Sequence, residues 1–320
     1  MGIPKLNRWL LEKCSPNSIK KKRLSEFEDR KIAVDISIYL YRFMMDDRFH
    51  ENLYLFLAIF KYYCIQPIFV FDGKAPIEKK DLLQRRKKDK QEASTEFCLL
   101  ENQLNTTVDE AKKKELQEKM ASLKKRMIKL TWTHIDAAIE LLVAFGFEYY
   151  LAPHEADELC VHLAVTNKVY AVLSDDMDLL ISGVPRILRS MNMMSHEIIL
   201  YDTSEILRDI NMTLNDFRQT VVLSGTDYDI QRQGFPIKRC FELFTEYKST
   251  HIQGLHQTFS EWLGQKGFID PVNFQHTCSL FDTSANVNEL DDFIRQNRVI
   301  TKMNLTAIKT IMRQHKFIFI

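Results

Sequence analysis

Seven acidic residues stand at the expected ends of regular elements, and this placement is the clearest chemical signal in the sequence. Asp35, Asp72, Asp176 and Asp178 follow apolar strand-like runs, and a Gly turn precedes Asp227. Glu155 and Asp157 begin a helix-like segment. A single Asp after a strand is more often a helix cap than a ligand. Six or seven carboxylates at one sheet edge would instead repel one another and favour bound divalent cations.

Carboxylate oxygens favour Mg²⁺, or Mn²⁺ in its place, over zinc, and this number of acids suits two ions acting on phosphate esters. One pair poses a geometrical problem. On a helix, residues two apart point about 200° apart, so Glu155 would share a face with Glu158 rather than with Asp157. Glu155 and Asp157 reach one site only at a frayed first turn, which Pro153 favours.

The elements that position these acids alternate between strands and helices. Strand-like runs are expected at residues 31–35, 67–71, 148–151, 169–173, 187–189 and 198–201, with helices at 37–45, 53–64 and 134–145. This order predicts an α/β fold, with a central, mostly parallel sheet flanked by helices. Beyond about residue 204 the chain reads as mainly helical, with a loop-like region near 265–290 and a last helix near 305–312.

A long charged segment, from Lys74 to about Leu130, interrupts the core pattern. It has no glycine, and its basic residues fall in two groups. A thin apolar stripe at helical spacing predicts a helix; its members are Leu116, Met120, Leu123 and Met127. Two interpretations stay open: a solvated helical hairpin or a nuclear-import-like patch on the one hand, and a basic arm that binds a phosphate backbone on the other.

The composition is that of an ordinary globular protein. The 320 residues carry 44 Lys and Arg against 43 Asp and Glu, so nucleic-acid affinity depends on how the charges are distributed. The six cysteines include no C-x-x-C pair, which argues against a disulfide framework and a thiolate zinc site. No apolar run reaches membrane-spanning length, and the N-terminus lacks a signal-peptide core. We therefore expect an intracellular protein of the nucleus or cytoplasm, monomeric and without a membrane partner.

In these motifs the chain resembles the structure-specific 5′-nucleases of the XPG type, which include flap endonuclease and exonuclease 1. The matching pieces occur in the order of the family; they are MGIPKL, AVDISIYLY, PIFVFDGKAP, APHEADE, LSDDMDLLISG and LSGTDY. They span roughly residues 1–240. The resemblance implies a PIN-like nuclease core, a helical arch over the active site, and a helical hairpin that grips duplex DNA.

The resemblance also implies roles for individual residues. The seven acids named above match the positions that hold two Mg²⁺ ions. Lys79 and Arg86 match the basic pair that contacts the scissile phosphate, with Lys80 and Arg85 as adjacent alternatives. Tyr41 matches an aromatic residue on which a displaced base stacks, although Tyr39 and Phe43 compete for that role and core packing is an equal alternative. The second residue of the family, Gly2 here, lies near the active site.

Two places depart from the family pattern. The Gly-hydrophobic-Gly hairpin that holds a phosphate and a monovalent cation reads Gly234-Phe235-Pro236 here, with Lys238 and Arg239 behind it. Proline has no N–H and cannot adopt positive φ, which argues against a phosphate or K⁺ site of the usual form, while the two basic residues remain candidates for DNA contact. The C-terminus, KFIFI, carries no clear sliding-clamp motif.

The predicted organisation is a nuclease core at residues 1–205 containing the arch insertion at 74–133. A helical region at 206–320 follows, with a degenerate helix-turn-helix hairpin near 225–245. The predicted function is a Mg²⁺-dependent nuclease acting on DNA with a 5′ flap or junction, in replication, repair or recombination. A 5′→3′ exonuclease, a 5′-end RNA nuclease and a catalytically silent DNA-junction binding protein remain alternatives.

Overall fold

The computed structural model describes residues 3, 5–107, 109–228, 234–250, 257–282, 287–299 and 301–319. Gly2, which the resemblance places near the active site, lies outside the described residues. No helix among the described residues combines the length and the apolar character needed to cross a bilayer. No disulfide joins any of them.

The described residues build one seven-stranded sheet with the order β1-β7-β6-β5-β2-β3-β4. The strands are β1 (Ile19–Arg23), β2 (Lys31–Asp35), β3 (Gln66–Phe71), β4 (Glu148–Leu151), β5 (Ala171–Leu173), β6 (Arg186–Asn192) and β7 (Glu197–Asp202). Strands β4, β3, β2, β5 and β6 run parallel, and β7 and β1 complete the sheet in antiparallel pairing. The predicted α/β fold with a mostly parallel sheet is confirmed.

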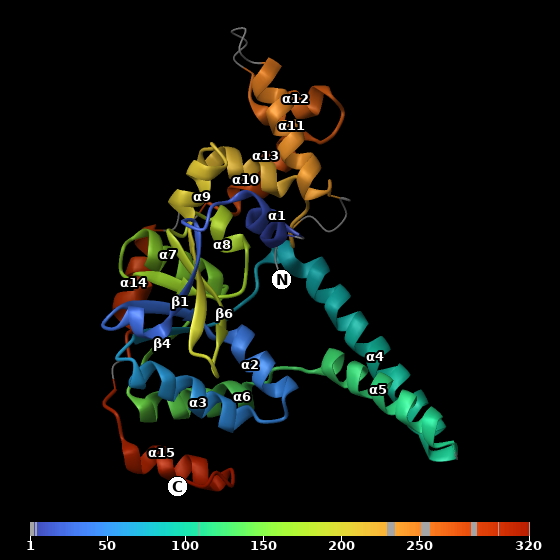
Figure 1. Cartoon of the computed structure of the whole chain (residues 1–320), viewed down its shortest axis with the longest axis vertical. Coiled ribbons are helices and arrows are strands. Elements are labelled where there is room, and N and C mark those ends of the chain that lie inside the picture. The colour runs from blue at the N-terminus through green and yellow to red at the C-terminus, as the bar shows by residue number, and fades with distance from the viewer. Residues whose placement is uncertain are drawn as a thin grey trace.

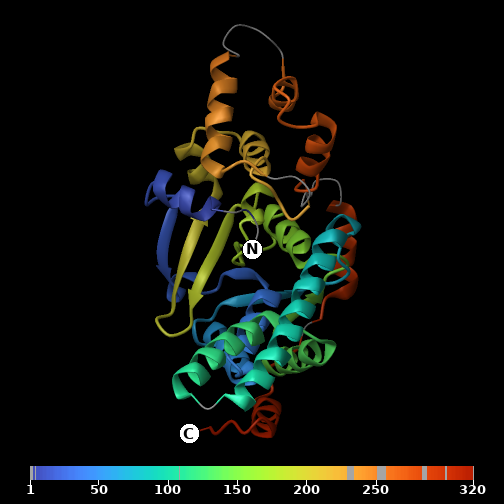
Figure 2. The same cartoon turned by 90° about the vertical axis from the view of Figure 1, so that its right-hand side faces the viewer.

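Helices cover both faces of this sheet (Figures 1 and 2). One face carries α1 (Leu6–Lys13), α7 (Ala156–Val165) and α8 (Asp178–Ile181); the other carries α2 (Ile36–Met45), α3 (Phe49–Tyr62) and α6 (Trp132–Phe145). The alternation of strand side chains explains the two layers, because Ala33 faces the first core while Ile32 and Val34 face the second. Strands buried on both faces have continuous apolar runs, as β2 does at residues 32–34 and β3 at residues 67–71.

A helical hairpin projects from the body between β3 and α6 (Figure 1). After the short 3-10 turn Ile77–Lys79, the hairpin consists of α4 (Lys80–Thr106) and α5 (Glu110–Met127). Leu116 and Leu123 of the predicted stripe are buried against α4, where Ala93 is fully buried. The helix predicted in α5 is therefore confirmed, and its single apolar stripe explains why one partner helix suffices to cover it.

The described chain after β7 is mainly helical, with α9 (Thr203–Asp209), α10 (Leu214–Val222), α11 (Ile237–Thr250), α12 (Phe259–Gln265), α13 (Pro271–Ser279), α14 (Val287–Asn297) and α15 (Leu305–Gln314). The prediction of a loop-like region near residues 265–290 was wrong, because α13 lies within it. Asp270 caps the backbone N–H of Val272 and Pro271 occupies the first turn, where proline is favoured. Helix α15 returns to pack on α3 and α6.

Strand β1 was not predicted from the sequence. Its residues, IKKKR, follow no apolar alternation, and it pairs only with β7 at the edge of the sheet. A short 3-10 turn, Leu24–Phe27, then leads into β2. Lysines are typical of edge strands because they discourage pairing with a further strand. The position of β1 at the sheet edge therefore explains why it is rich in lysine and lacks the apolar alternation typical of a strand.

Candidate metal centre and active site

Adjacent parallel strands deliver the predicted acids to one edge of the sheet. Asp35 is the last residue of β2, and Asp72 follows β3 directly. Asp176 comes three residues after the end of β5, and Asp178 begins α8. Because β5, β2 and β3 are neighbours and parallel, their carboxyl ends open at the same edge, where such sheets usually bind ligands.

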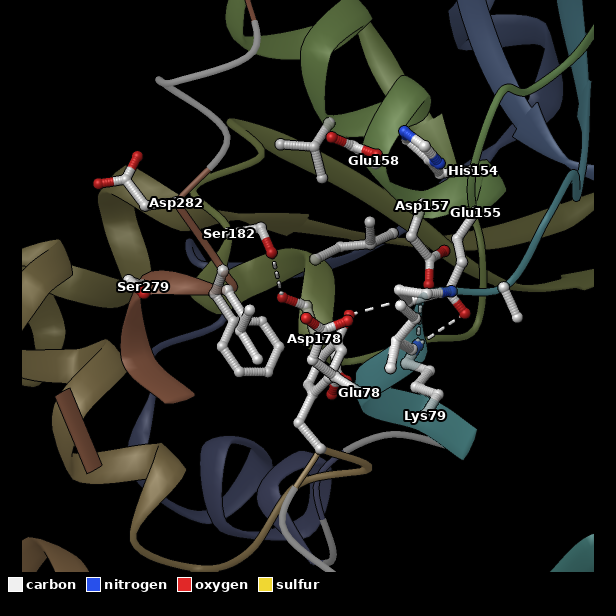
Figure 3. Close-up of a pocket in the computed structure, with 18 of the residues that line it drawn as sticks. Glu78, Lys79, His154, Glu155, Asp157, Glu158, Asp178, Ser182, Ser279 and Asp282 are labelled. Carbon is white, nitrogen blue, oxygen red and sulfur yellow. Dashed lines mark hydrogen bonds and ion pairs between the residues drawn. The ribbon is translucent and has the colours of Figure 1, made fainter. Parts of the chain in front are cut away.

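The geometrical problem at the start of α7 is resolved by its cap. Glu155 is the N-cap residue and has an extended backbone, with φ −81° and ψ 150°, whereas Asp157 lies inside the first turn. Because Glu155 does not have helical backbone angles, the separation of about 200° between residues two apart on a helix does not apply to Glu155 and Asp157. Figure 3 shows both side chains directed toward Lys79, with Glu158 set apart. The backbone N–H of Ala156 donates to Oδ1 of Asp72 at 3.0 Å, which joins this turn to the end of β3.

Hydrogen bonds connect the loop after β5 to the acids of this edge. The buried hydroxyl of Ser174 donates to Oδ2 of Asp35 at 2.9 Å and accepts from the backbone N–H of Asp176 at 3.2 Å. Oδ1 of Asp176 accepts from the backbone N–H of Asp178 at 3.0 Å. Oδ1 of Asp178 is buried and has no hydrogen-bond partner among the described residues. A buried carboxylate oxygen without a donor is a site where a cation fits.

The electrostatics of this edge indicate excess negative charge. Burial, together with the charges of Asp72 and Asp176, raises the pKa of Asp35 to about 8. Burial and neighbouring carboxylates also raise the pKa values of Asp157 and Asp178 well above their ordinary range. Bound divalent cations would relieve this repulsion and keep the acids ionised.

The donor set fits Mg²⁺ in its chemistry, because it consists of carboxylate oxygens. As the side chains lie, no three acidic, histidine or cysteine residues of the described chain converge closely enough to enclose one ion. Mg²⁺ usually keeps several of its waters and takes only one or two carboxylates directly. Carboxylates spread around a shared space therefore suit hydrated Mg²⁺, and the orphaned Oδ1 of Asp178 marks where direct ligation is available.

Two cations from the base of the hairpin contact the acidic edge. Nζ of Lys79 lies 2.7 Å from Oε2 of Glu155 and 4.7 Å from the centre of the Tyr228 ring. Burial alone would lower the pKa of the Lys79 ammonium, but Tyr228, Glu155 and Asp157 outweigh it and raise that pKa. The guanidinium of Arg86 donates to Asp227 at 3.2 Å. The insertion therefore places positive charge directly opposite the carboxylates.

The alternatives for the basic pair separate clearly in the structure. Lys80 and Arg85 are exposed to solvent, whereas Lys79 and Arg86 form ion pairs with acids of the site. The side chain of Lys79 is only 12% exposed. Of the four candidates, Lys79 and Arg86 are thus the two that the fold brings to the acidic edge.

The aromatic candidates on α2 separate in the same way. Tyr39 and Phe43 are buried in the core, where Tyr39 stacks on Phe56 with ring centres 4.5 Å apart. Tyr41 is partly exposed, and Nζ of Lys90 lies 5.7 Å from the centre of its ring. Tyr41 is therefore the aromatic ring of the three that remains accessible to a stacking base.

The expected hairpin near 225–245 is described only in part, since residues 229–233 lie outside the described chain. A Cβ on Gly234 would sit 2.0 Å from the carbonyl oxygen of Ser224, so this glycine permits close backbone contact. Arg239 pairs with Glu242 and Glu246 along its own helix, at 3.4 and 2.6 Å. Lys238 is exposed. Of the two basic residues behind the hairpin, Lys238 is thus the one better placed to contact a phosphate.

A pocket of about 620 Å³ opens beside the acidic edge (Figure 3). It lies between the turn before α4, the starts of α7 and α8, and the chain after α13; Lys79, Asp157, Asp178, Tyr228 and Phe281 are among its lining residues. The ring of Phe281 packs edge-on against Tyr228, with centres 5.3 Å apart. Acids, a cation and aromatic rings thus share one space.

Sequence reasoning missed two residues at this site, Ser174 and Tyr228. The hydroxyl of Tyr228 lies 3.4 Å from Oε2 of Glu155 while its ring lies near the Lys79 ammonium. Both missed residues adjoin or nearly adjoin a predicted acid, as Tyr228 follows Asp227 and Ser174 precedes Asp176 by two positions. Their closeness in sequence to a predicted acid was the only available signal. It does not show which residues next to an acid direct their side chains into the site.

Comparisons with known proteins define the class of this chain. A model of the XPG N-terminal domain matches residues 1–93, and a model of the XPG I-region matches residues 146–227. Flap endonuclease 1 of Glycine max is 31% identical over 252 residues, covering 71% of this chain and 62% of the relative. Flap endonuclease 1 of Yarrowia lipolytica is 31% identical over 268 residues, covering 78% of this chain and 69% of the relative. The chain belongs to the XPG family of structure-specific nucleases.

Solved structures share the fold. The catalytic core of Rad2 in complex with a DNA substrate superposes with a TM-score of 0.62 at 20% identity, covering 98% of this chain and 95% of that one. The Holliday junction-resolving enzyme GEN1, in complex with product DNA and Mg²⁺, gives a TM-score of 0.57 at 16% identity, covering 98% and 73%. The seven-stranded core with flanking helices is thus the fold of these nucleases.

Proposed function

We propose that this chain is a Mg²⁺-dependent nuclease that cleaves DNA at single-strand/double-strand junctions, with 5′ flaps as its substrate class. The observation that carries this proposal is the pairing of Lys79 and Arg86, from the base of the hairpin, with Glu155 and Asp227 of the acidic edge. Carboxylates for cations and fixed positive charge for a phosphate lie within one site, which is the arrangement that phosphodiester hydrolysis needs.

The acidic residues have the role of metal ligands in this proposal. Those that would hold two Mg²⁺ ions, or Mn²⁺ in their place, are Asp35, Asp72, Glu155, Asp157, Asp176, Asp178 and Asp227. The bound ions would act as Lewis acids and lower the pKa of the attacking water. In hydrolysis a water oxygen bonds to phosphorus while one bridging P–O bond breaks, so negative charge grows on the phosphate oxygens.

The side chains of Lys79 and Arg86 would stabilise that growing negative charge. Lys79 is largely buried, with Tyr228 beside it, and its ammonium is therefore little screened by solvent. Entry of a phosphate would let Lys79 and Arg86 exchange their carboxylate partners for phosphate oxygens. Such fixed charges need no reorganisation at the moment of reaction, which is why they stabilise a transition state efficiently.

The hairpin and α2 support a substrate with a single-stranded segment. Helix α4 begins at the acidic edge and runs outward with α5 (Figure 1). Both helices carry many lysines. Tyr41 offers a partly exposed ring with Lys90 nearby. A basic, projecting hairpin can bind the phosphates of a single-stranded nucleic acid along its length. An accessible aromatic ring can stack on an unpaired base.

Product lengths on labelled substrates test the proposal. Purified protein with Mg²⁺ is expected to release one flap-length oligonucleotide from 5′-labelled flap DNA. Mononucleotides and dinucleotides would instead identify a 5′→3′ exonuclease. Preferential cleavage of a matched RNA flap would identify an RNA nuclease, and binding of the DNA flap without cleavage would identify a junction-binding protein.

A further inference from the structure

Both carboxylate oxygens of Asp175 accept hydrogen bonds, although Asp175 is not among the predicted metal ligands. Oδ2 accepts from the guanidinium of Arg42 at 2.6 Å, and Oδ1 accepts from the backbone N–H of Ser190 at 2.7 Å. Its backbone carbonyl accepts from Arg189 at 2.8 Å. One residue therefore ties the loop after β5 to α2 on one side and to β6 on the other.

The contact with β6 exploits an irregularity in that strand. The pairing of β6 with β7 shifts register between Arg189 and Asn192, and Ser190 there has a positive φ of 52°. This conformation is uncommon for a residue other than glycine. At this bulge the Ser190 N–H donates to the Asp175 side chain, and the extra residue in β6 provides the donor that fixes Asp175.

The partners of Asp175 are themselves held in place. The guanidinium of Arg42 lies 5.3 Å from the ring centre of Tyr39, which is buried in the core. The guanidinium of Arg189 lies 5.3 Å from the ring centre of Tyr201, also buried. Stacking on fixed rings limits the movement of both arginines, so they form a rigid support.

The loop that Asp175 fixes carries two candidate ligands. Asp176 is the next residue, and its carboxylate accepts the backbone N–H of Asp178. Ser174, on the other side, bonds Oδ2 of Asp35 while its backbone N–H donates to Leu188 of β6 at 3.1 Å. A rotation of the loop about Asp175 would therefore move Asp176 and Asp178 relative to Asp35.

We propose that Asp175, held by Arg42 and by the bulge of β6, is a positioning residue that sets the geometry of Asp176 and Asp178 for Mg²⁺. It acts through its neighbours and touches neither substrate nor ion. The inference rests on the proposed function, because it presumes that those two acids are ligands. Residues that orient metal ligands affect metal affinity or activity by about 10- to 100-fold when they are lost.

Calorimetric titration of the DNA-free protein with Mg²⁺ tests the inference. Asp175→Ala is expected to weaken Mg²⁺ affinity by about tenfold or more. Asp175→Asn keeps an acceptor for Ser190 and should give an intermediate affinity. Asp209→Ala is the matched control, since Asp209 also accepts a backbone N–H and a hydroxyl, from Ser15 and Ser18, and lies outside the proposed site. The control should bind Mg²⁺ as the wild type does.

A second pair of variants keeps the test decisive if Asp175→Ala does not fold. Arg42→Ala should weaken Mg²⁺ affinity, and Arg42→Lys should restore part of it, because the lysine keeps the charge facing Asp175. Wild-type affinity in folded Asp175→Ala, or in Arg42→Ala, would overturn the positioning role. A wild type that binds Mg²⁺ but cleaves no DNA would contradict only the proposed function, so the two failures are distinguishable.

Discussion

Nζ of Lys79 lies 2.7 Å from Oε2 of Glu155, although the two residues are 76 positions apart in the chain. Lys79 precedes the projecting hairpin, and Glu155 caps the helix that follows β4. The ion pair therefore joins the insertion to the sheet edge and forms the candidate site from both. The proposed cleavage at this site would therefore depend on the insertion as much as on the core.

Loss of the buried ammonium should slow catalysis strongly. Lys79→Met is expected to lower the single-turnover cleavage rate by about 10²- to 10³-fold, the usual effect of removing one group that stabilises transition-state charge. Lys80→Met, one residue further on and exposed, should change the rate by less than about threefold, since exposed charges are screened. Equal rates for the two variants, measured with saturating protein, would contradict the assigned role of Lys79.

Loss of the accessible ring on α2 should weaken DNA binding. Tyr41→Ala is expected to weaken the affinity for flap DNA by about 1–3 kcal/mol, the range for one stacked base. Tyr62→Ala is the control, because Tyr62 is 76% exposed and lies on α3. Fluorescence anisotropy with a labelled flap measures both affinities, and a Tyr41 variant that binds as the Tyr62 variant does would exclude stacking on Tyr41.

Stability should fall in mild acid because of a histidine contact beneath α15. The rings of His50 and His315 stack with centres 3.3 Å apart, and burial, then His315 and His134, lower the pKa of His50 to about 4. The ordinary pKa of histidine is about 6.5, so the unfolded chain binds this proton first as pH falls. Stability from the neutral ring is complete above pH 6.5 and is lost toward pH 4.

Urea unfolding of the wild type and His50→Gln checks this dependence. The midpoint for the wild type should fall more steeply between pH 7 and pH 4.5 than the midpoint for the variant. Parallel pH profiles would show that His50 does not contribute to the loss of stability in acid.

The turn after β3 leaves no room for a side chain. A Cβ on Gly73 would lie 1.8 Å from the carbonyl oxygen of Ala152, and the Gly73 N–H donates to the carbonyl of His154 at 2.6 Å. Gly73→Ala must therefore shift the backbone that leads to Glu155. We expect the free energy of unfolding to fall by about 1–3 kcal/mol, the range for overpacking. An unchanged urea midpoint would mean that this contact relaxes freely.

Local patterns predicted much of the core. An acid ends β2 and directly follows β3, and each strand has an apolar run before that acid, so both the strands and the positions of Asp35 and Asp72 followed from the sequence. The pattern failed where context decides the structure. IKKKR becomes a strand because β7 supplies its partner, and residues 271–279 form a helix although an Asp-Pro pair also fits a turn.

The acids of the site could be predicted from the sequence, but the residues that hold them in position could not. Arg42 and Asp175 are 133 positions apart, and no local spacing predicts that they meet. The orientation of Glu155 was also undecided, because it depends on where α7 begins. An N-cap differs from a first helical residue by one position, a difference that sequence patterns do not resolve.

Cleavage of 5′-labelled flap DNA tests most directly whether the acidic edge binds Mg²⁺ for phosphodiester cleavage. Wild type with Mg²⁺ should cut the flap, and EDTA should abolish cutting. Asp178→Ala should lose cleavage at a DNA affinity close to that of the wild type, while Asp292→Ala, on the surface of α14, should cut at the wild-type rate. Cleavage by Asp178→Ala at the wild-type rate, or no cleavage by the wild type with Mg²⁺, would contradict this account.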